Sequence, residues 1–214
     1  MNGEEHGQQW LKSNLGCDDR ALDLLAAFVA ALGEENRRQN LVAARSLDEV
    51  WWRHVVDSAQ LLLVSRETKL GAGSWWDLGS GAGFPGLVIA VLSSDTQVCL
   101  VEERKARAGW LTQAVAQLGL RNVRVIGQPL KRVATEPAAV ISARAFAPLG
   151  KLLGLAARFS TPETVWLLPK GESARQEVEG LPAGLRRMFR VEPSATNPAA
   201  GIVVGRGVVD ARGV

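Results

Sequence analysis

The residues with the clearest potential for chemistry lie in one short segment, where an acid is followed by closely spaced glycines. Asp77 stands two positions before Gly79, and Gly81 and Gly83 follow at alternate positions. Glycines at this spacing let the backbone turn tightly and approach a ligand. The spacing from Gly81 to Gly86 is also Gly-x-Gly-x-x-Gly, which is typical of dinucleotide-binding loops. The segment therefore predicts a site for a nucleotide-like cofactor.

Two cofactors fit such a loop, and the charges around it favour one of them. A dinucleotide would place its pyrophosphate at the N-terminus of the helix that follows. Glu102, 25 residues after Asp77, ends the next apolar run, and an acid there can accept the hydroxyls of a ribose. Because the segment has two acids and the loop itself has no lysine or arginine, we expect S-adenosylmethionine rather than NAD. A glycine-rich turn that merely packs a helix on a strand is the plainer alternative.

Apolar runs that alternate with helical stretches must position these residues, and they begin after a linker at residues 71–73. Such alternation predicts a mostly parallel sheet with helices on both faces. Ligands of these sheets bind beyond the carboxyl ends of the strands, so residues that end strands are the candidates for chemistry. The expected strands are residues 75–78, 98–101, 123–126, 140–142, 165–168 and 202–204, and the expected helices are residues 85–92, 105–118, 149–159 and 173–179.

The first 70 residues show helical patterns instead. Asp18 or Asp19 is placed to cap a helix that we expect to end near residues 33–36, before a polar connector at residues 37–41. Ser46 and Glu49 have the spacing of a capping box, which predicts a second helix. We therefore expect a helical extension over residues 1–70 and a cofactor-binding domain over residues 71–214.

Length, composition and charge exclude several classes of protein. The chain has 214 residues and two cysteines, and it lacks both an apolar stretch of membrane-spanning length and the basic and apolar regions of a signal peptide. We expect a soluble, cytoplasmic protein with no membrane partner. With only two histidines, His6 and His54, no metal site is expected. Residues 1–70 hold 8 basic and 11 acidic side chains, and residues 71–214 hold 17 and 11, so the second part suits a polyanionic partner.

Four segments together resemble a known family. The run from Asp77 to Gly86 resembles the first motif of the glucose-inhibited division protein B family, which comprises bacterial small-subunit ribosomal RNA guanine-N7 methyltransferases. Asn40-Leu41-Val42 with the run from Arg53 to Ser58 resembles its N-terminal signature, the run from Ser142 to Leu149 its central segment, and Lys170-Gly171 its strand-end pair. The similarity covers most of residues 36–171.

The resemblance implies a fold, a cofactor and an acceptor. The fold is α/β, a Rossmann-like class I methyltransferase with a mostly parallel seven-stranded sheet, helices on both faces and an N-terminal helical extension. The methyl donor is S-adenosylmethionine, the acceptor is 16S ribosomal RNA or the small ribosomal subunit, and we expect a monomer. In the loop after the third core strand, the usual Arg-x-Glu is replaced by Gln-Pro-Leu. The expected cofactor-binding residues are Asp77, Gly79, Gly81, Gly83, Phe84, Glu102, Pro129, Leu130 and Arg144.

Two cationic residues are the candidates for binding and orienting the RNA acceptor during methyl transfer. Arg144 and Lys170 end consecutive expected strands, so both should reach one rim, and we predict that they are catalytic. Guanine N7 carries an exposed lone pair and needs no general base, so positioning can supply much of the rate, roughly 7–11 kcal/mol. Protein cannot enter the deep major groove of A-form RNA, so the base must be unpaired or extruded. The expected RNA-binding residues are Arg37, Arg38, Asn40, Arg53 and Lys170.

Plainer interpretations stay open for several of these residues. Arg144 could form a salt bridge with a sheet-end acid, Asp77 or Glu102, and Lys170 could be a solvated lysine. For His54 we favour a packed or hydrogen-bonded side chain over a group at the rim of the active site. Trp51, Trp52 and Trp76 fit core or interdomain packing better than base stacking.

Two other functions are compatible with these patterns. One is an S-adenosylmethionine-binding module for RNA or ribosome assembly with little turnover, which the changed Gln128-Pro129-Leu130 loop favours. The other is an NAD-linked oxidoreductase on a similar fold, although the chain has no tyrosine for a Tyr-x-x-x-Lys site.

Overall fold

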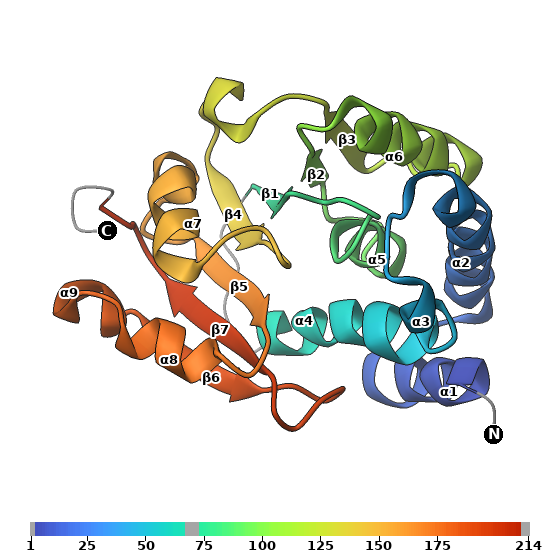
Figure 1. The fold of residues 1–214 in the computed structure, drawn as a ribbon, viewed down its shortest axis with the longest axis horizontal. Helices are drawn as coiled ribbons and strands as arrows, with labels where there is room; N and C mark the ends of the chain where they lie inside the picture. Colours follow the sequence, from blue (N-terminus) through green and yellow to red (C-terminus); the bar gives the residue numbers. More distant parts are fainter. Residues whose placement is uncertain (1–2, 67–72, 211–214) are drawn as a thin grey trace.

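A seven-stranded sheet forms the centre of the protein (Figure 1). The computed structural model describes residues 3–66 and 73–210. The strands lie in the order β3-β2-β1-β4-β5-β7-β6. The first five are parallel, and β7 is antiparallel to both β5 and β6. The strands are β1 (Ser74–Leu78), β2 (Val98–Val101), β3 (Val123–Ile126), β4 (Ala138–Ser142), β5 (Val165–Lys170), β6 (Phe189–Pro193) and β7 (Gly201–Arg206). The predicted mostly parallel, seven-stranded sheet is confirmed.

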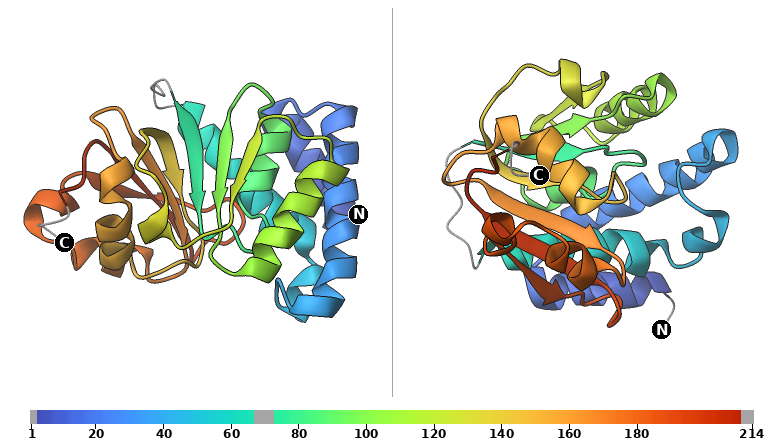
Figure 2. Two further views of the ribbon diagram at one scale, coloured as in Figure 1. Left: turned by 90° about the horizontal axis from the view of Figure 1, so that it is seen from above. Right: turned by 60° about the vertical axis from the view of Figure 1, so that its left-hand side comes forward.

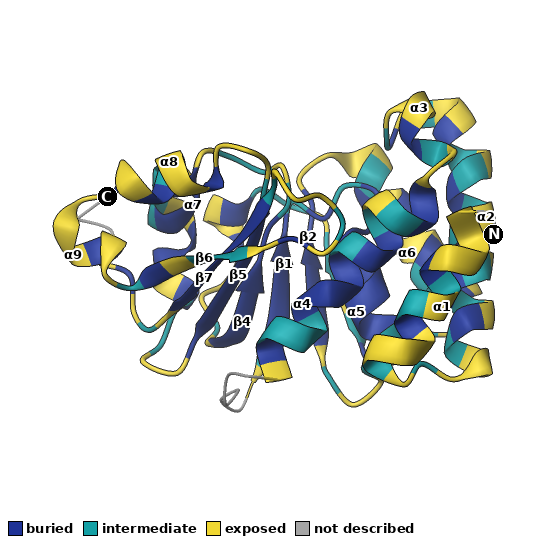
Figure 3. Cartoon of the chain, turned by 90° about the horizontal axis from the view of Figure 1, so that it is seen from below, coloured by how far each residue is buried: buried dark blue, intermediate teal, exposed yellow. Residues whose placement is uncertain are grey.

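Two apolar cores cover the two faces of this sheet. Successive residues of a strand point to opposite faces, so Trp75 belongs to one core and Trp76 to the other. In β5, Val165 and Trp166 are divided in the same way. Figure 3 shows the central strands as the most continuously buried part of the molecule. Strands buried on both faces are continuously apolar, which explains why these runs are recognisable in the sequence.

Helices pack on both faces of the sheet (Figure 2). The helices of the N-terminal part share one core with α5 and α6, and α7, α8 and α9 share the other core. The first group is α1 (Gly3–Leu15), α2 (Asp19–Gln39), the π-helix η1 (Trp51–Val56), α4 (Asp57–Arg66), α5 (Gly86–Leu92) and α6 (Lys105–Gln117), and the second is α7 (Leu149–Ala156), α8 (Ala174–Glu179) and α9 (Ala183–Arg186).

Helix α2 begins as predicted but runs further than predicted. The Asp18 side chain accepts a hydrogen bond from the amide of Ala21 at 2.8 Å, which caps the helix. The predicted end near residues 33–36 is wrong, because the helix continues to Gln39 and stops at Asn40, whose φ is +46°. The buried Asn36 explains the extension, since its side chain exchanges hydrogen bonds with the backbone of Val42 at 2.8 and 3.1 Å. The predicted polar connector is therefore largely helical.

The predicted second helix is divided into three pieces. A short helix α3 (Ala44–Leu47) precedes the π-helix η1, and α4 follows directly. The capping box does not form, because Ser46 lies inside α3 and is the N-cap of neither α3 nor η1. Its hydroxyl donates to the carbonyl of Ala43 at 2.7 Å and lies 2.9 Å from His54 Nε2. Short π-helical segments are rare and occur frequently at functional sites.

The remaining differences from the predicted elements are local. Strand β6 and helix α9 are not among the predicted runs, since β6 is an edge strand in which only Phe189 is fully buried. The predicted helix 149–159 ends at Ala156 and continues as the 3₁₀-helix η3 (Ala157–Phe159). Two residues of the predicted linker, Gly71 and Ala72, lie outside the described residues. Of the helices in the described ranges, none has both the length and the apolar character to cross a membrane.

Candidate active site

The glycine-rich turn lies between β1 and α5, at the carboxyl edge of the sheet. Its backbone is left-handed at three positions, with φ of +72° at Gly79, +54° at Gly81 and +107° at Gly83. Glycine adopts such values without steric cost. The amides of Gly79 and Ser80 donate to the carbonyl of Val101 at 2.8 and 3.1 Å, which ties the turn to the end of β2. The three predicted glycines thus form one rigid turn beside β2.

Asp77 ends in the interior of the protein beneath this turn. Its side chain is fully buried and accepts hydrogen bonds from Ser142 Oγ at 3.0 Å and from the Gly86 amide at 3.2 Å. Burial raises the pKa of Asp77 to about 6, against the effect of these hydrogen bonds. The carboxylate thereby joins β1 to β4 and to the start of α5, and its predicted contact with the cofactor stays a prediction.

Glu102 ends β2 and holds the turn from the other side. One oxygen accepts from the Gly81 amide at 3.0 Å and the other from the Arg104 amide at 2.8 Å. The side chain is almost buried, with 5% exposed. Each carboxylate oxygen has a second lone pair, so this orientation leaves acceptor capacity for a pair of hydroxyl groups.

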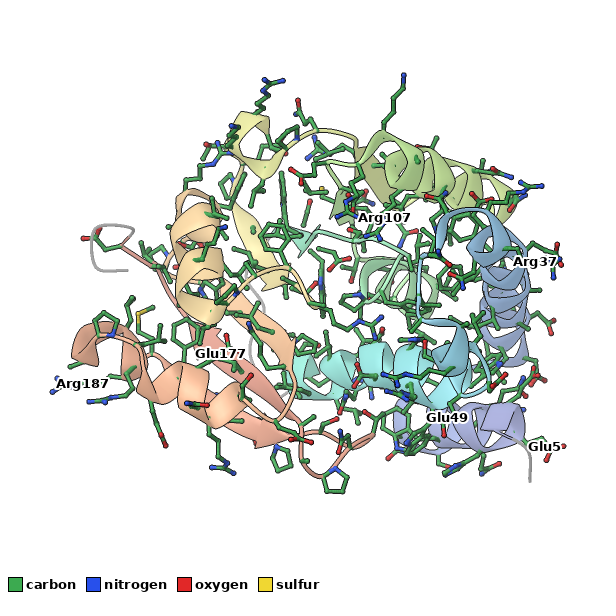
Figure 4. The ribbon with its side chains drawn as sticks, in the orientation of Figure 1. Glu5, Arg37, Glu49, Arg107, Glu177 and Arg187 are labelled. Carbon is green, nitrogen blue, oxygen red and sulfur yellow. The ribbon has the colours of Figure 1, made fainter. Side chains whose placement is uncertain are left out.

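Two residues near the turn are not among those that the motifs predict. A Cβ built on Gly79 would lie 2.3 Å from Phe146 Cδ2, so the ring of Phe146 covers this glycine closely. Arg107 of α6 reaches the turn as well, since its Nη1 lies 3.7 Å from a Cβ built on Gly81, and Figure 4 shows this side chain above α5. The sequence holds no signal that pairs either residue with a particular glycine.

The loop after β3 lies at the same edge of the sheet, because β3 is parallel to β2. Pro129 is half-buried and precedes the 3₁₀-helix η2 (Leu130–Arg132), in which Leu130 is buried. The carbonyls of Pro129 and Leu130 accept hydrogen bonds from the amides of Arg132 and Val133. The loop is therefore ordered internally, and its contact with an adenine remains a prediction.

Arg144 follows β4 and contacts the N-terminal segment. Its Nη1 lies 2.9 Å from His54 Nδ1 and 3.4 Å from Asp57 Oδ2. The expected alternative partners, Asp77 and Glu102, are not its ion-pair partners, and Asp57 takes that role. Burial lowers the pKa of Arg144 from its ordinary value, and the charge of Asp57 counters this effect. The arginine is thus held by the segment that carries η1 and α4.

The ring of Phe84 packs against the guanidinium group of Arg144. The guanidinium carbon lies 5.0 Å from the centre of the Phe84 ring, and the ring of His54 stacks on Phe84 at 5.1 Å. Only 3% of Phe84 is exposed. The ring is in contact with Arg144, His54 and the core residue Phe28, and its predicted contact with the cofactor stays a prediction.

Lys170 ends β5 and is held by two acceptors. Its Nζ donates to the carbonyl of Ala147 and to Glu177 Oε2, both at 2.9 Å. Burial alone would raise the pKa of Glu177. Hydrogen bonds from Lys170, the Leu149 amide and Ser173 outweigh this effect, so the pKa of Glu177 lies below its ordinary value. An ammonium has three donors, so one N–H of Lys170 is left for another acceptor.

A cavity of about 690 Å³ brings the two predicted catalytic cations together. Glu49 borders it from the N-terminal segment and Glu177 from α8 (Figure 4). The cavity is within the size range of small-molecule sites. Its other charged and aromatic lining residues are Trp52, Arg53, Asp57, Arg144 and Lys170.

The predicted RNA-binding residues divide into two groups. Arg53 and Lys170 line the cavity. Arg37 and Arg38 lie at the end of α2, where they pair with Glu34 and Glu35 of the same helix, and Figure 4 shows Arg37 on the outer side of that helix. Asn40 is the C-cap of α2. The last three residues do not line the cavity, and their contact with RNA remains a prediction.

The residues at the turn fit S-adenosylmethionine. Glu102 is fixed by two backbone amides and keeps lone pairs for a ribose diol. A Cβ on Gly81 would make only ordinary van der Waals contacts, at 3.7 Å, so no atom crowds the loop backbone there. No lysine or arginine is part of the turn itself, which agrees with a cofactor that lacks phosphates.

The strand order, the glycine turn at its switch point and the acid at the end of β2 define a Rossmann-like, class I S-adenosylmethionine-dependent methyltransferase. Solved structures share this fold. An S-adenosylmethionine-dependent methyltransferase from Aquifex aeolicus matches with a TM-score of 0.55 and 15% identity, covering 85% of this chain and 98% of that one. The mitomycin 7-O-methyltransferase matches with a TM-score of 0.55 and 14% identity, covering 88% and 68%.

Sequence comparisons narrow the class to a family. The family model for rRNA small subunit methyltransferase G, GidB, matches residues 21–192. Ribosomal RNA small subunit methyltransferase G of Novosphingobium aromaticivorans is 56% identical over 203 residues, which cover 95% of this chain and 88% of that protein. The protein of the same name from Erythrobacter litoralis is 55% identical over 192 residues, covering 89% and 91%. The chain belongs to the rRNA small subunit methyltransferase G family, so the predicted resemblance is confirmed and the oxidoreductase alternative is excluded.

Proposed function

We propose that this methyltransferase transfers the methyl group of S-adenosylmethionine to N7 of a guanine in 16S ribosomal RNA. The choice of N7 as the methylated atom rests on the hydrogen-bond and ion-pair partners of the acidic residues that line the cavity. Glu49 pairs with Arg53, and Glu177 pairs with Lys170. Asp57 accepts from Arg144, Gln60 and Thr196. Every carboxylate of this lining is therefore already engaged as an acceptor.

This arrangement suits an acceptor atom that needs no deprotonation. His54 is no base either, because burial and the charges of Arg144 and Arg53 lower its pKa to about 3 and its Nδ1 accepts from Arg144. A hydroxyl or an exocyclic amine would have to lose a proton during methyl transfer, whereas N7 of guanine attacks with its own lone pair. The site supports attack by N7 best.

The chain's own residues position the base and balance its charge. When bound, S-adenosylmethionine supplies an electrophilic methyl group on a sulfonium. The free N–H of Lys170 is placed to hold guanine O6 or a phosphate at the rim. Arg144 is fixed on Phe84 by His54 and Asp57, so it borders the acceptor cavity without freedom to cover N7. Because N7 lies in an inaccessible groove of A-form RNA, the base must enter unpaired or extruded.

Product analysis tests this proposal. The enzyme is incubated with isotope-labelled S-adenosylmethionine and either deproteinised 16S ribosomal RNA or small subunits from a strain that lacks the gene. The RNA is then digested to nucleosides for mass spectrometry. We expect label in 7-methylguanosine. Label in another methylated nucleoside would overturn the choice of atom, and the comparison of the two substrates identifies the preferred one.

We also propose that the enzyme acts as a monomer in the cytoplasm, where ribosomal RNA is modified. Light scattering during size-exclusion chromatography tests the monomeric state, with a mass near 22.9 kDa expected and a dimer mass contradicting it.

A further inference from the structure

The π-helix η1 places two neighbouring tryptophans in different surroundings. Trp51 is 4% exposed and belongs to the core, where its Cβ lies 2.9 Å from a Cβ built on Gly7 of α1. Trp52 is half-buried and lines the cavity that also holds Arg144 and Lys170. Core packing therefore accounts for the position of Trp51 but does not account for the position of Trp52 at the cavity.

The indole of Trp52 is held from two sides. One ring face stacks on His6 of α1, with ring centres 4.3 Å apart and planes 14° from parallel. Its Nε1 donates to the carbonyl of Thr196 at 3.1 Å, and the Thr196 hydroxyl donates in turn to Asp57 Oδ1 at 2.7 Å. Helix α1, the π-helix and the β6–β7 loop thus fix the ring before any ligand arrives.

A fixed aromatic wall beside cations is the chemistry that recognises an extruded base. Bases removed from a helix stack on aromatic side chains, and nearby cations bind the phosphates. Arg53 and Lys170 supply such cations at the same cavity. A preoriented ring also loses little conformational freedom on binding.

We propose that Trp52 stacks against a purine base of the RNA acceptor inside this cavity, with His6 supporting the opposite ring face. The inference rests on the proposed function, since it assigns a base-binding residue to the same site. It replaces the sequence-based interpretation of Trp52 as a packing residue.

Three variants test the inference. Trp52→Leu removes the aromatic face, Trp52→Phe keeps one, and Trp10→Leu is the matched control, a partly buried tryptophan of α1 that does not line the cavity. For each, KM and kcat are measured with deproteinised 16S ribosomal RNA, and affinity for S-adenosylhomocysteine is measured by calorimetry.

We expect Trp52→Leu to raise the KM for RNA about 10-fold, within the roughly 5- to 150-fold range that base stacking on an aromatic residue supports. Affinity for S-adenosylhomocysteine should change less than about 2-fold. Trp52→Phe should recover most of the loss, and Trp10→Leu should leave the KM unchanged. An unchanged KM in Trp52→Leu overturns the inference, as does a parallel loss of S-adenosylhomocysteine affinity without rescue by phenylalanine.

A spectroscopic measurement separates stacking from a structural role. Guanosine 5′-monophosphate should quench tryptophan emission in the wild type and in Trp10→Leu, and this quenching should be lost in Trp52→Leu. Equal quenching in all three proteins overturns the inference. If the wild type labels a nucleoside other than 7-methylguanosine, the proposed function fails, but the KM ratio between wild type and Trp52→Leu still decides the role of Trp52.

Discussion

Arg144 and His54 share a hydrogen bond whose direction is fixed by chemistry. The guanidinium has only donors, so Nη1 of Arg144 donates to Nδ1 of His54 across 2.9 Å. The imidazole is therefore neutral with its proton on Nε2, which lies 2.9 Å from Ser46 Oγ. The Ser46 hydroxyl donates onward to the carbonyl of Ala43. The strand-end arginine is thus oriented by a chain of hydrogen bonds that starts in the N-terminal helical segment.

This relationship predicts a loss of stability in acid. The pKa of His54 in the folded protein is about 3, below its ordinary 6.5, so unfolding takes up a proton at pH values between the two. The free energy of unfolding therefore falls as the pH drops below 6.5, by about 2 kcal/mol at pH 5. His54→Asn keeps an acceptor near Nδ1 but does not titrate. Urea unfolding at pH 7.5 and pH 5 should show the smaller loss in the variant.

The other histidine offers a matched control. If His6→Asn reduces the loss of unfolding free energy between pH 7.5 and pH 5 as much as His54→Asn does, the assignment of this loss to His54 is wrong.

Asp77 is expected to have the opposite pH dependence. Its pKa is raised from 3.8 to about 6 by burial, so the folded protein holds a proton that the unfolded chain releases between these values. The free energy of unfolding then falls as the pH rises from about 4 to about 6, by at most about 3 kcal/mol. Urea unfolding of Asp77→Asn in the His54→Asn background, compared with His54→Asn alone, isolates this contribution. Parallel pH profiles would contradict it.

The turn glycines should not be equally sensitive to substitution. Gly79→Ala places a methyl group 2.3 Å from Phe146 Cδ2 at a φ of +72°, whereas Gly81→Ala meets only atoms at 3.7 Å. A left-handed residue with a Cβ costs roughly 1–2 kcal/mol, and Gly79→Ala adds displacement of the Phe146 ring. We expect the larger fall in Tm and in S-adenosylhomocysteine affinity for Gly79→Ala. Adding Phe146→Ala should restore part of the Tm, and failure to do so would exclude the steric cause.

Lys170 should affect methyl transfer more than cofactor binding. Lys170→Met keeps the apolar stem but removes a charge-assisted donor, which is worth roughly 1.5–3 kcal/mol, or about 10- to 150-fold in kcat/KM for RNA. S-adenosylhomocysteine affinity should stay within about 2-fold. Glu177→Gln weakens the interaction that holds Lys170 in place but leaves the positive charge of Lys170. This variant should therefore lose less methyl-transfer activity than Lys170→Met. Equal losses of methyl transfer and cofactor affinity in Lys170→Met would remove Lys170 from the acceptor site.

Where local pattern decided the structure, prediction from the sequence succeeded. The strands β2 and β3 begin and end where their apolar runs do, and the glycines of the turn have the backbone angles that only glycine readily adopts. Prediction failed where a side chain bonds to the backbone beyond the expected end of an element. Helix α2 passes its predicted end because Asn36 bonds to the backbone of Val42.

The sequence by itself determined the parallel strands, the turn and the cations at the strand ends, because apolar runs, glycine and strand-end charge are properties of consecutive residues. Only the tertiary structure decided which way the side chains point. Asp77 turns inward to Ser142 and Gly86, and Trp52 is fixed by His6 and Thr196. Except for Gly86, these partners lie 46 or more residues away in the sequence, so their convergence follows from how the chain packs and not from any local pattern.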